Sequence, residues 1–190
     1  MSNVKGNALE GFTRFVSQRH GPSGLSRWQA CLDPQDAAMV NGLILPHGWY
    51  PVRIWNGLVD RYVALYGDGD PHSFRPVADA VADGDLHRFF KVLMKAASPA
   101  MVLRRAGSLW ERYFDEGTMD STELAANHFT IRLTAPRLQD RGPGPVTCAV
   151  GVPAWQERTL ALAGARGPRA NHTQCRFRGA VVCEFDVSWS

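Results

Sequence analysis

The spacing of apolar residues changes near Gly117, and this change constrains the fold more than any other feature. Before it, the stretch from Pro51 to Tyr66 has apolar residues at steps of three and four, which form one stripe along a helix. After it, the stretch from His128 to Thr134 alternates between apolar and polar residues, as a half-buried strand does. The change predicts an α/β chain of the α+β kind. Residues 1–117 form a mostly helical half, and residues 118–190 form a β-β-α-β-β half with an antiparallel sheet.

Capping residues and breakers divide the helical half further. Asp33-Pro34 and Ser98-Pro99 each combine a capping side chain with proline at the first helical position. The predicted helices run over 9–19, 23–32, 33–40, 51–66, 74–81, 86–97 with Asp85 as cap, and 98–116. In the second half the predicted strands run over 119–124, 128–134, 170–177 and 181–189, with a helix around Trp155 that ends at Gly164.

Composition narrows the classes of protein. With 190 residues and 45% hydrophobic content, the chain is expected to form one domain over residues 1–190. Its net charge of +3 comes from dispersed arginines rather than a clustered basic face, so nucleic acid is not an expected partner. No apolar run approaches the ~20 residues of a membrane span, and the N-terminus lacks the apolar run of a signal peptide. We therefore expect a cytoplasmic protein with reduced cysteines.

The last twenty residues predict a hairpin with two cysteines on facing strands. If the turn centres on Gly179, Cys175 lies directly across from Cys183, with their Cβ atoms ~4.5–5.5 Å apart. Alternation then assigns the hairpin residues to two faces. The buried face has Cys175, Phe177, Cys183, Phe185, Val187 and Trp189, and the solvent face has Gln174, Arg176, Arg178, Glu184, Asp186 and Ser188.

This cysteine pair has three interpretations: two reduced core thiols, two ligands of a metal ion, or a disulfide. For a metal, Cys148 and His172 would complete a Cys3His set, which suits a closed, structural Zn²⁺ site. Strand parity places His172 on the opposite face from Cys175, unless a bulge or irregular backbone precedes Cys175.

From about Phe129 to Ser190 the chain resembles the 4-vinyl reductase domain family of small-molecule-binding modules. The resemblance lies in Cys148 before a helix, Gly164 at the end of that helix, the spacing His172-x2-Cys175-x3-Gly179-x3-Cys183, and the alternation of Phe185, Val187 and Trp189. Phenol-sensing regulators of this group have a comparable zinc-binding set, with glutamate in place of His172. The resemblance implies zinc ligands at Cys148, His172, Cys175 and Cys183.

The whole chain is also similar to uncharacterised myxobacterial-type proteins, which have a Leu-Pro-x-Gly-Trp-Tyr-Pro segment like the one from Leu45 to Pro51. Both resemblances imply a fold shared with haem–nitric oxide binding domains and transport-particle subunits. In that superfamily the sheet and helices enclose an apolar ligand pocket, or the surface serves for dimerisation or partner contact. The candidate pocket residues are Phe89, Phe90, Trp110, Tyr113, Phe129 and Trp155, which could equally form a filled core.

The expected function is a sensory or regulatory module that binds a small apolar ligand, acts through a homodimer or a protein partner, and catalyses nothing. The alternative is a scaffold with a filled core, similar to transport-particle subunits. An enzyme is a weaker alternative, because Asp85, His87 and Ser108 match no catalytic signature. A haem is not expected, because neither His87 nor His128 lies in a recognisable haem motif.

Overall fold

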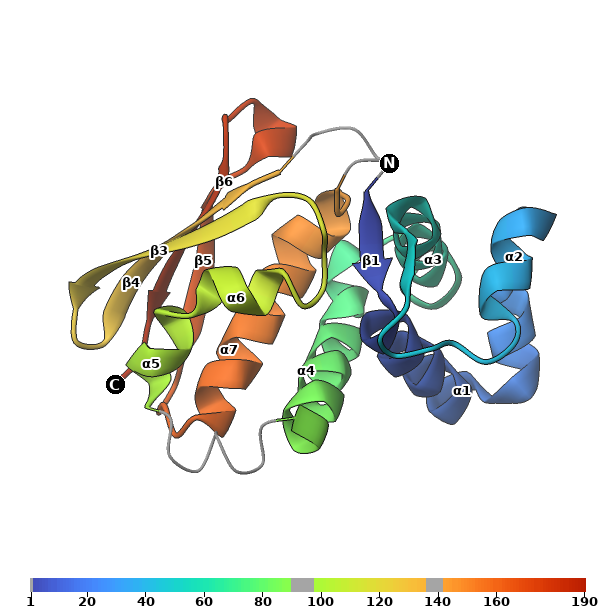
Figure 1. The fold of residues 1–190 in the computed structure, drawn as a ribbon, viewed down its shortest axis with the longest axis horizontal. Coiled ribbons are helices and arrows are strands. Elements are labelled where there is room, and N and C mark those ends of the chain that lie inside the picture. Colours follow the sequence, from blue (N-terminus) through green and yellow to red (C-terminus); the bar gives the residue numbers. More distant parts are fainter. Residues whose placement is uncertain (1, 90–97, 136–141) are drawn as a thin grey trace.

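The computed structural model describes residues 2–89, 98–135 and 142–190. Figure 1 shows the helical half on the right and a twisted sheet on the left, with α4 and α7 between them. This is the predicted α+β class with a helical first half. The predicted pocket residue Phe90 and most of the predicted helix 86–97 lie outside the described residues, as does the side chain of Phe89.

The helical half begins with a short strand and a long helix. Strand β1 (Asn3–Lys5) pairs antiparallel with β2 (Trp49–Pro51). Helix α1 (Gly6–Gln29) has a kink at Gly21, whose φ of 69° is in the region that favours glycine, and Pro22 follows it. Helix α2 (Pro34–Val40) starts as predicted, because the Asp33 carboxylate accepts a hydrogen bond from the Asp36 amide at 2.8 Å.

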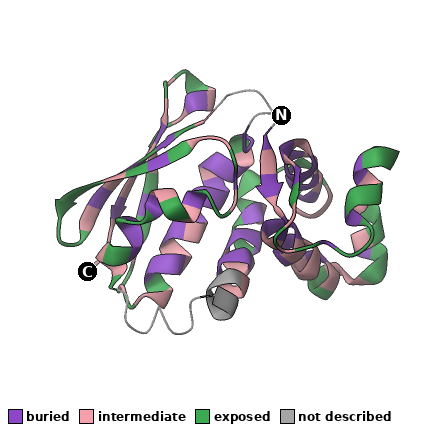
Figure 2. Ribbon diagram, in the orientation of Figure 1, coloured by how far each residue is buried: buried purple, intermediate pink, exposed green. Residues whose placement is uncertain are grey.

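Helix α3 (Val52–Tyr66) buries the predicted stripe against α1. Phe12 of α1 lies at the centre of this packing. Its ring centroid is 4.4 Å from that of Trp28. The ring centroids of Trp55, Tyr62 and Phe74 lie 5.5–5.6 Å from it. The Trp28 indole donates to the Leu58 carbonyl at 2.7 Å, so the buried N–H of this ring is paired. Figure 2 shows the buried residues along the facing sides of these helices.

Two predicted helix boundaries are wrong. After the short helix η1 (Pro71–Phe74), α4 (Arg75–Phe89) continues without a break through Asp85, which is therefore not a cap. The predicted helix 98–116 is two short helices, α5 (Pro99–Leu103) and α6 (Ala106–Trp110). Ser98 caps α5 as predicted, with its hydroxyl accepting from the Met101 amide at 3.4 Å. Tertiary packing, rather than local propensity, decides these boundaries.

The second half is an antiparallel sheet in the order β3-β4-β6-β5. Its strands are β3 (Thr118–Ala125), β4 (His128–Thr134), β5 (Arg169–Gln174) and β6 (Cys183–Ser188). Between β4 and β5 the chain forms the π turn η2 (Thr147–Gly151) and α7 (Val152–Leu162), and the 3-10 turn η3 (Arg176–Arg178) connects β5 to β6. The predicted β-β-α-β-β order is confirmed.

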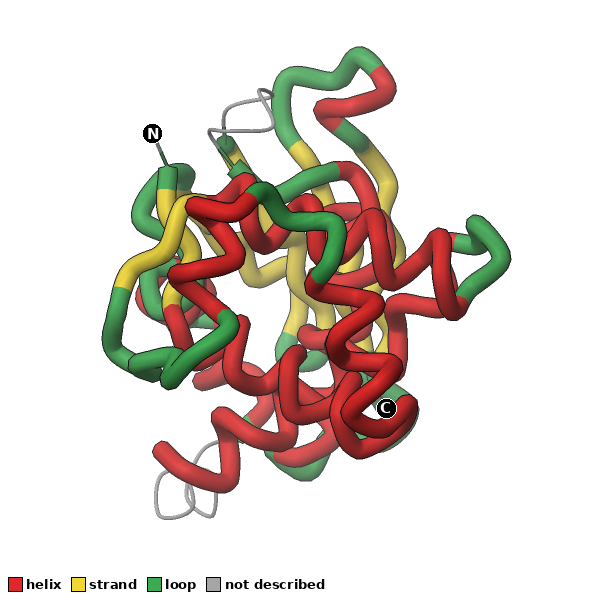
Figure 3. The backbone as a smooth tube through the Cα atoms, turned by 90° about the vertical axis from the view of Figure 1, so that its right-hand side faces the viewer, coloured by secondary structure: helices red, strands yellow, loops and turns green. Residues whose placement is uncertain are grey.

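The helices cover one face of this sheet (Figure 3). Phe129, Ile131 and Leu133 of β4 point to that face and are fully buried. The opposite face has polar contacts between neighbouring strands: an ion pair of Arg132 with Glu184 at 2.8 Å, and a hydrogen bond between His128 and Asp186 at 2.7 Å. None of the described helices is long and apolar enough to cross a membrane.

Candidate metal centre and ligand cavity

A β-bulge in β5 places His172 beside the cysteines. His172 pairs with Phe185 of β6, but Gln174 pairs with Glu184, so one residue, Thr173, is extra in β5. A one-residue shift moves side chains to the other face of a strand. His172 therefore faces inward, where its ring stacks on Phe185 with 4.6 Å between centroids. The irregularity that the metal hypothesis required is present.

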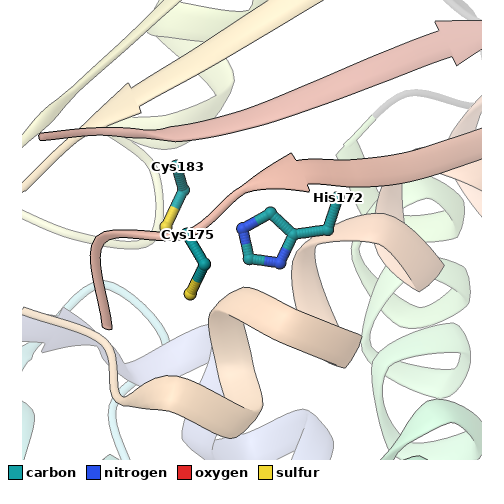
Figure 4. A group of neighbouring side chains, drawn as sticks. All are labelled: His172, Cys175 and Cys183. Carbon is teal, nitrogen blue, oxygen red and sulfur yellow. The ribbon is translucent and has the colours of Figure 1, made fainter. Parts of the chain in front are cut away.

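Three of the four predicted ligands form one cluster. The ligand atoms of His172, Cys175 and Cys183 all lie within 4.8 Å of one another, and Figure 4 shows the imidazole on the helix side of the strands, turned toward the two cysteines. Two thiolates on one tetrahedral zinc lie about 3.8 Å apart, because each Zn–S bond is about 2.3 Å. Small side-chain movements would therefore bring these atoms to ligand positions. The Nε2 atom of His172 is buried without a hydrogen-bond partner among the described residues.

Cys148, the fourth predicted ligand, is fully buried in η2, where its thiol donates to the Pro143 carbonyl at 3.9 Å. Arg176 donates from its guanidinium to the Cys148 sulfur at 3.3 Å and also to the Pro143 carbonyl. The prediction that Arg176 faces solvent is wrong, since only 1% of it is exposed. The strand ends at Gln174, and the turn η3 that follows does not continue the alternation.

The cluster favours a thiolate. The neighbouring Cys148 side chain, together with His172 and the Arg176 backbone N–H, lowers the pKa of Cys183 to about 4. The neighbouring Cys183 side chain and burial raise the pKa of Cys148 well above its usual value. Cys148 therefore keeps its proton, and Cys183 is the thiolate, with the Arg176 cation nearby. All four cysteines of the chain are free of disulfides, so the disulfide alternative is not the arrangement in this structure.

A separate apolar cavity of about 80 Å³ lies among α4, α6 and α7. Trp110, Tyr113 and Trp155, three of the predicted pocket residues, line it. Phe129 does not: it is buried in the sheet, where its ring stacks on Trp189 at 5.8 Å. The other lining residues are Ala8, Trp55, Phe74, Ala78, Val81, Val102, Leu103, Ala106, Leu109, Phe114, Met119, Thr147, Gly151, Val152, Gln156 and Thr159.

The cavity has few polar groups, and the indole N–H groups of two lining tryptophans are hydrogen-bonded to lining hydroxyl groups. The Trp155 indole donates to the Tyr113 hydroxyl, and the Trp55 indole donates to the Thr147 hydroxyl, each at 3.0 Å.

Gln156 and Thr159 of α7 are also buried at the cavity, and the sequence analysis did not predict them as pocket residues. Their spacing could have indicated it, because they follow Val152 by four and seven residues and so share its helix face.

A second hollow lies on the surface between α1 and α4. It has a volume of about 340 Å³, is open to solvent, and is lined by polar and small residues that include Arg14, Gln18 and Asp83. Small-molecule sites are typically enclosed and strongly apolar, whereas this groove is open and much of its lining is polar. The cavity beside α7 is therefore the better ligand-site candidate.

Comparison with solved structures identifies the fold. An H-NOX protein from S. oneidensis in the Fe(II)NO ligation state superposes with a TM-score of 0.75 at 12% identity, over 98% of this chain and 99% of that chain. An unliganded Fe(II) H-NOX protein from K. algicida gives 0.70 at 11%, over 98% and 96%. No protein-family model and no curated protein matches the sequence.

These likenesses cover nearly the whole chain, and at such low identities they show the fold alone. The chain has the H-NOX fold, with a helical first half followed by a four-stranded antiparallel sheet and its helix. This confirms the fold relationship to haem–nitric oxide binding domains that the sequence resemblance implied.

Proposed function

We propose that this chain is a sensory or regulatory module that binds a small molecule in the cavity beside α7 and catalyses nothing. The observation that carries the proposal is the cavity itself, which is lined by residues of α1, α3 and α4 on one side and of α7 on the other. Ligand sites are concave and mostly apolar, with few polar groups. A ligand there would contact both halves of the fold, so its binding could alter how they pack.

Haem, which the solved H-NOX structures suggest, does not fit this cavity. Pockets for drug-sized ligands measure ~300–1,000 Å³, and a porphyrin needs a space of that order, against about 80 Å³ here. Haem iron also requires an axial ligand, which can be histidine, cysteine, methionine or tyrosine. Histidine and cysteine do not occur among the described lining residues. Met119 and Tyr113 do occur there, and the Tyr113 hydroxyl is already engaged, because it accepts a hydrogen bond from Trp155. We therefore propose a ligand smaller than haem.

The ligand test uses native mass spectrometry of the full chain exposed to a lysate extract. We expect a bound small molecule in the unmodified protein and none in Ala106→Leu, which fills the cavity. Ala161→Leu, an exposed change on α7, is the matched control and should bind normally. Equal adducts on all three proteins would contradict a ligand site in the cavity.

The proposal includes a structural zinc ion held by Cys148, His172, Cys175 and Cys183, as in the zinc-binding regulators that resemble the C-terminal part. The donor set supports it, because soft thiolates with one imidazole suit tetrahedral Zn²⁺. The unpartnered, buried His172 Nε2 atom also supports it. When bound, the ion would cross-link η2 to the last hairpin. Elemental analysis of purified protein should find about one zinc per chain, and a value near zero would contradict the site.

The second candidate function is a scaffold, and one observation favours it. Four large apolar side chains from α2 to the start of β2 are exposed: Met39, Leu43, Leu45 and Trp49. Exposed apolar residues that gather into a patch often mark protein contacts. These residues would equally serve a sensory module that signals through a homodimer or a protein partner. Light scattering distinguishes a monomer from a dimer. If these residues form a dimer interface, the double variant Leu43→Ser, Leu45→Ser should be monomeric under conditions in which the unmodified protein is dimeric.

A further inference from the structure

Two side chains of α7 have buried polar atoms at the cavity that no described residue satisfies. Gln156 is 3% exposed and Thr159 is 1% exposed, and both line the cavity. The amide nitrogen and oxygen of Gln156 and the hydroxyl of Thr159 have no hydrogen-bond partner among the described residues. Buried side-chain polar atoms are nearly always paired with protein or ordered water. Three such atoms on one helix face mark a site that a further molecule would complete.

The other polar groups of the lining are engaged. The Thr147 hydroxyl accepts from the Trp55 indole, and the Tyr113 hydroxyl accepts from the Trp155 indole. No Lys, Arg, His, Asp or Glu occurs among the described lining residues, so a charged molecule would lose its hydration without a counter-ion. The cavity therefore selects a neutral molecule.

Size gives a further limit. The cavity measures about 80 Å³, against ~300–1,000 Å³ for pockets that take drug-sized ligands, so it suits a much smaller molecule. The side-chain amide of Gln156 offers a donor and an acceptor side by side. The complementary group is another amide, whose N–H and C=O can make two parallel hydrogen bonds with it. The Thr159 hydroxyl, one helical turn away, can pair with a remaining atom of the ligand.

We propose that the cavity binds a small neutral amide-type molecule, a primary carboxamide or a urea, through Gln156 and Thr159. This inference rests on the proposed ligand-binding function and names the chemical class of its ligand. Aromatic walls at Trp110 and Trp155 exclude water around the two hydrogen bonds. Recognition depends on hydrogen bonding, because an apolar molecule of equal size leaves the polar groups unpaired and binds more weakly.

The test compares three probes on the full chain by NMR titration: acetamide, acetone and xenon. Acetone has the shape of acetamide but lacks its donor, and xenon reports only open apolar space. We expect acetamide to bind at least about tenfold more tightly than acetone, with the largest shift at the Gln156 side-chain amide. Gln156→Leu should abolish this preference, and Thr159→Val should reduce it. Gln35→Leu, on the exposed side of α2, is the matched control and should keep it.

The outcomes separate this inference from the proposed function. If xenon binds and acetamide binds no better than acetone, the cavity is a ligand site but the amide class is wrong. The amide class is also wrong if ordered waters remain on Gln156 at saturating acetamide. If no probe enters, the proposed ligand-binding function fails as well. Gln156→Leu removes an unsatisfied polar group, so it should fold; Thr159→Val gives a second measurement if it does not.

Discussion

The ring of His172 stacks on the ring of Phe185, with 4.6 Å between centroids and 22° between planes. The contact exists because the bulge at Thr173 turns His172 to the inner face of the sheet, the face on which Cys183 is buried. A regular strand would point this imidazole away from the cysteines. The bulge thus converts two facing cysteines into a group with three possible metal ligands.

Replacing His172 tests its role as a ligand. We expect His172→Ala to lower zinc affinity by about 100-fold or more, beyond the 10–100-fold typical of outer-shell changes. His172→Glu should retain part of the affinity, because a carboxylate can also bind zinc. Competition with a chromogenic chelator measures both. His72→Ala, an exposed histidine in η1, should behave as the unmodified protein, and equal affinity in all four proteins would exclude His172 as a ligand.

Arg176 should balance the charge of the metal centre. Zinc with three thiolates and one neutral imidazole has a net charge of −1, and the Arg176 guanidinium donates to the Cys148 sulfur at 3.3 Å. We expect Arg176→Met to weaken zinc binding by about 10–100-fold, as outer-shell changes do. Arg178→Met, in the same turn but exposed, should leave affinity unchanged. If both variants bind zinc equally well, Arg176 has no part in holding the ion.

The metal-free protein should contain a thiolate at neutral pH. The pKa of Cys183 is lowered to about 4, whereas an unfolded cysteine titrates near 8.5. The thiolate therefore contributes stability that is present above pH ~8.5 and is lost as the pH falls through ~4. The difference in thiolate absorbance between the unmodified protein and Cys183→Ser should persist from pH 8 down to about pH 5. A difference that appears only above pH ~8 would contradict a lowered pKa.

Phe12 should be the most sensitive position of the helical half. Its ring contacts four other aromatic rings and is fully buried, so Phe12→Ala leaves a cavity that neighbouring rings cannot fill. We expect a loss of about 3–5 kcal/mol in the free energy of unfolding. Leu43→Ala, at an exposed site, should change it by less than about 0.5 kcal/mol. Urea denaturation measures both, and similar values for the two variants would show that this aromatic group is not the core.

Much of the architecture could be predicted from the sequence, because its periodicities are strong. The change in the spacing of apolar residues near Gly117 predicted the helical half and the sheet half. The alternation of apolar and polar residues in β4 and β6 predicted which face of the sheet is buried. Alternation failed at Arg176, because it applies only within a strand and β5 ends at Gln174. The sequence could show only that a metal site with His172 would need a bulge before Cys175. It could not predict the bulge itself, since no residue type in the segment requires an extra residue there.

The cavity was harder to predict than the metal centre. Cysteine and histidine indicate their chemistry by residue type, whereas an aromatic side chain at helical spacing looks the same in a filled core and in a pocket wall. Phe129 and Trp155 illustrate this: the first packs within the sheet, and the second lines the cavity. The informative residues were Gln156 and Thr159, polar residues on an apolar helix face, whose lack of partners is visible only in three dimensions.

The central claim is that the space beside α7 accepts a small molecule, and diffraction from a xenon-pressurised crystal tests it most directly. We predict a xenon atom between Trp110, Trp155 and Gln156 in the unmodified protein, and its loss in Ala106→Leu. Side chains filling that space in the unmodified protein, with no xenon among them, would contradict the claim.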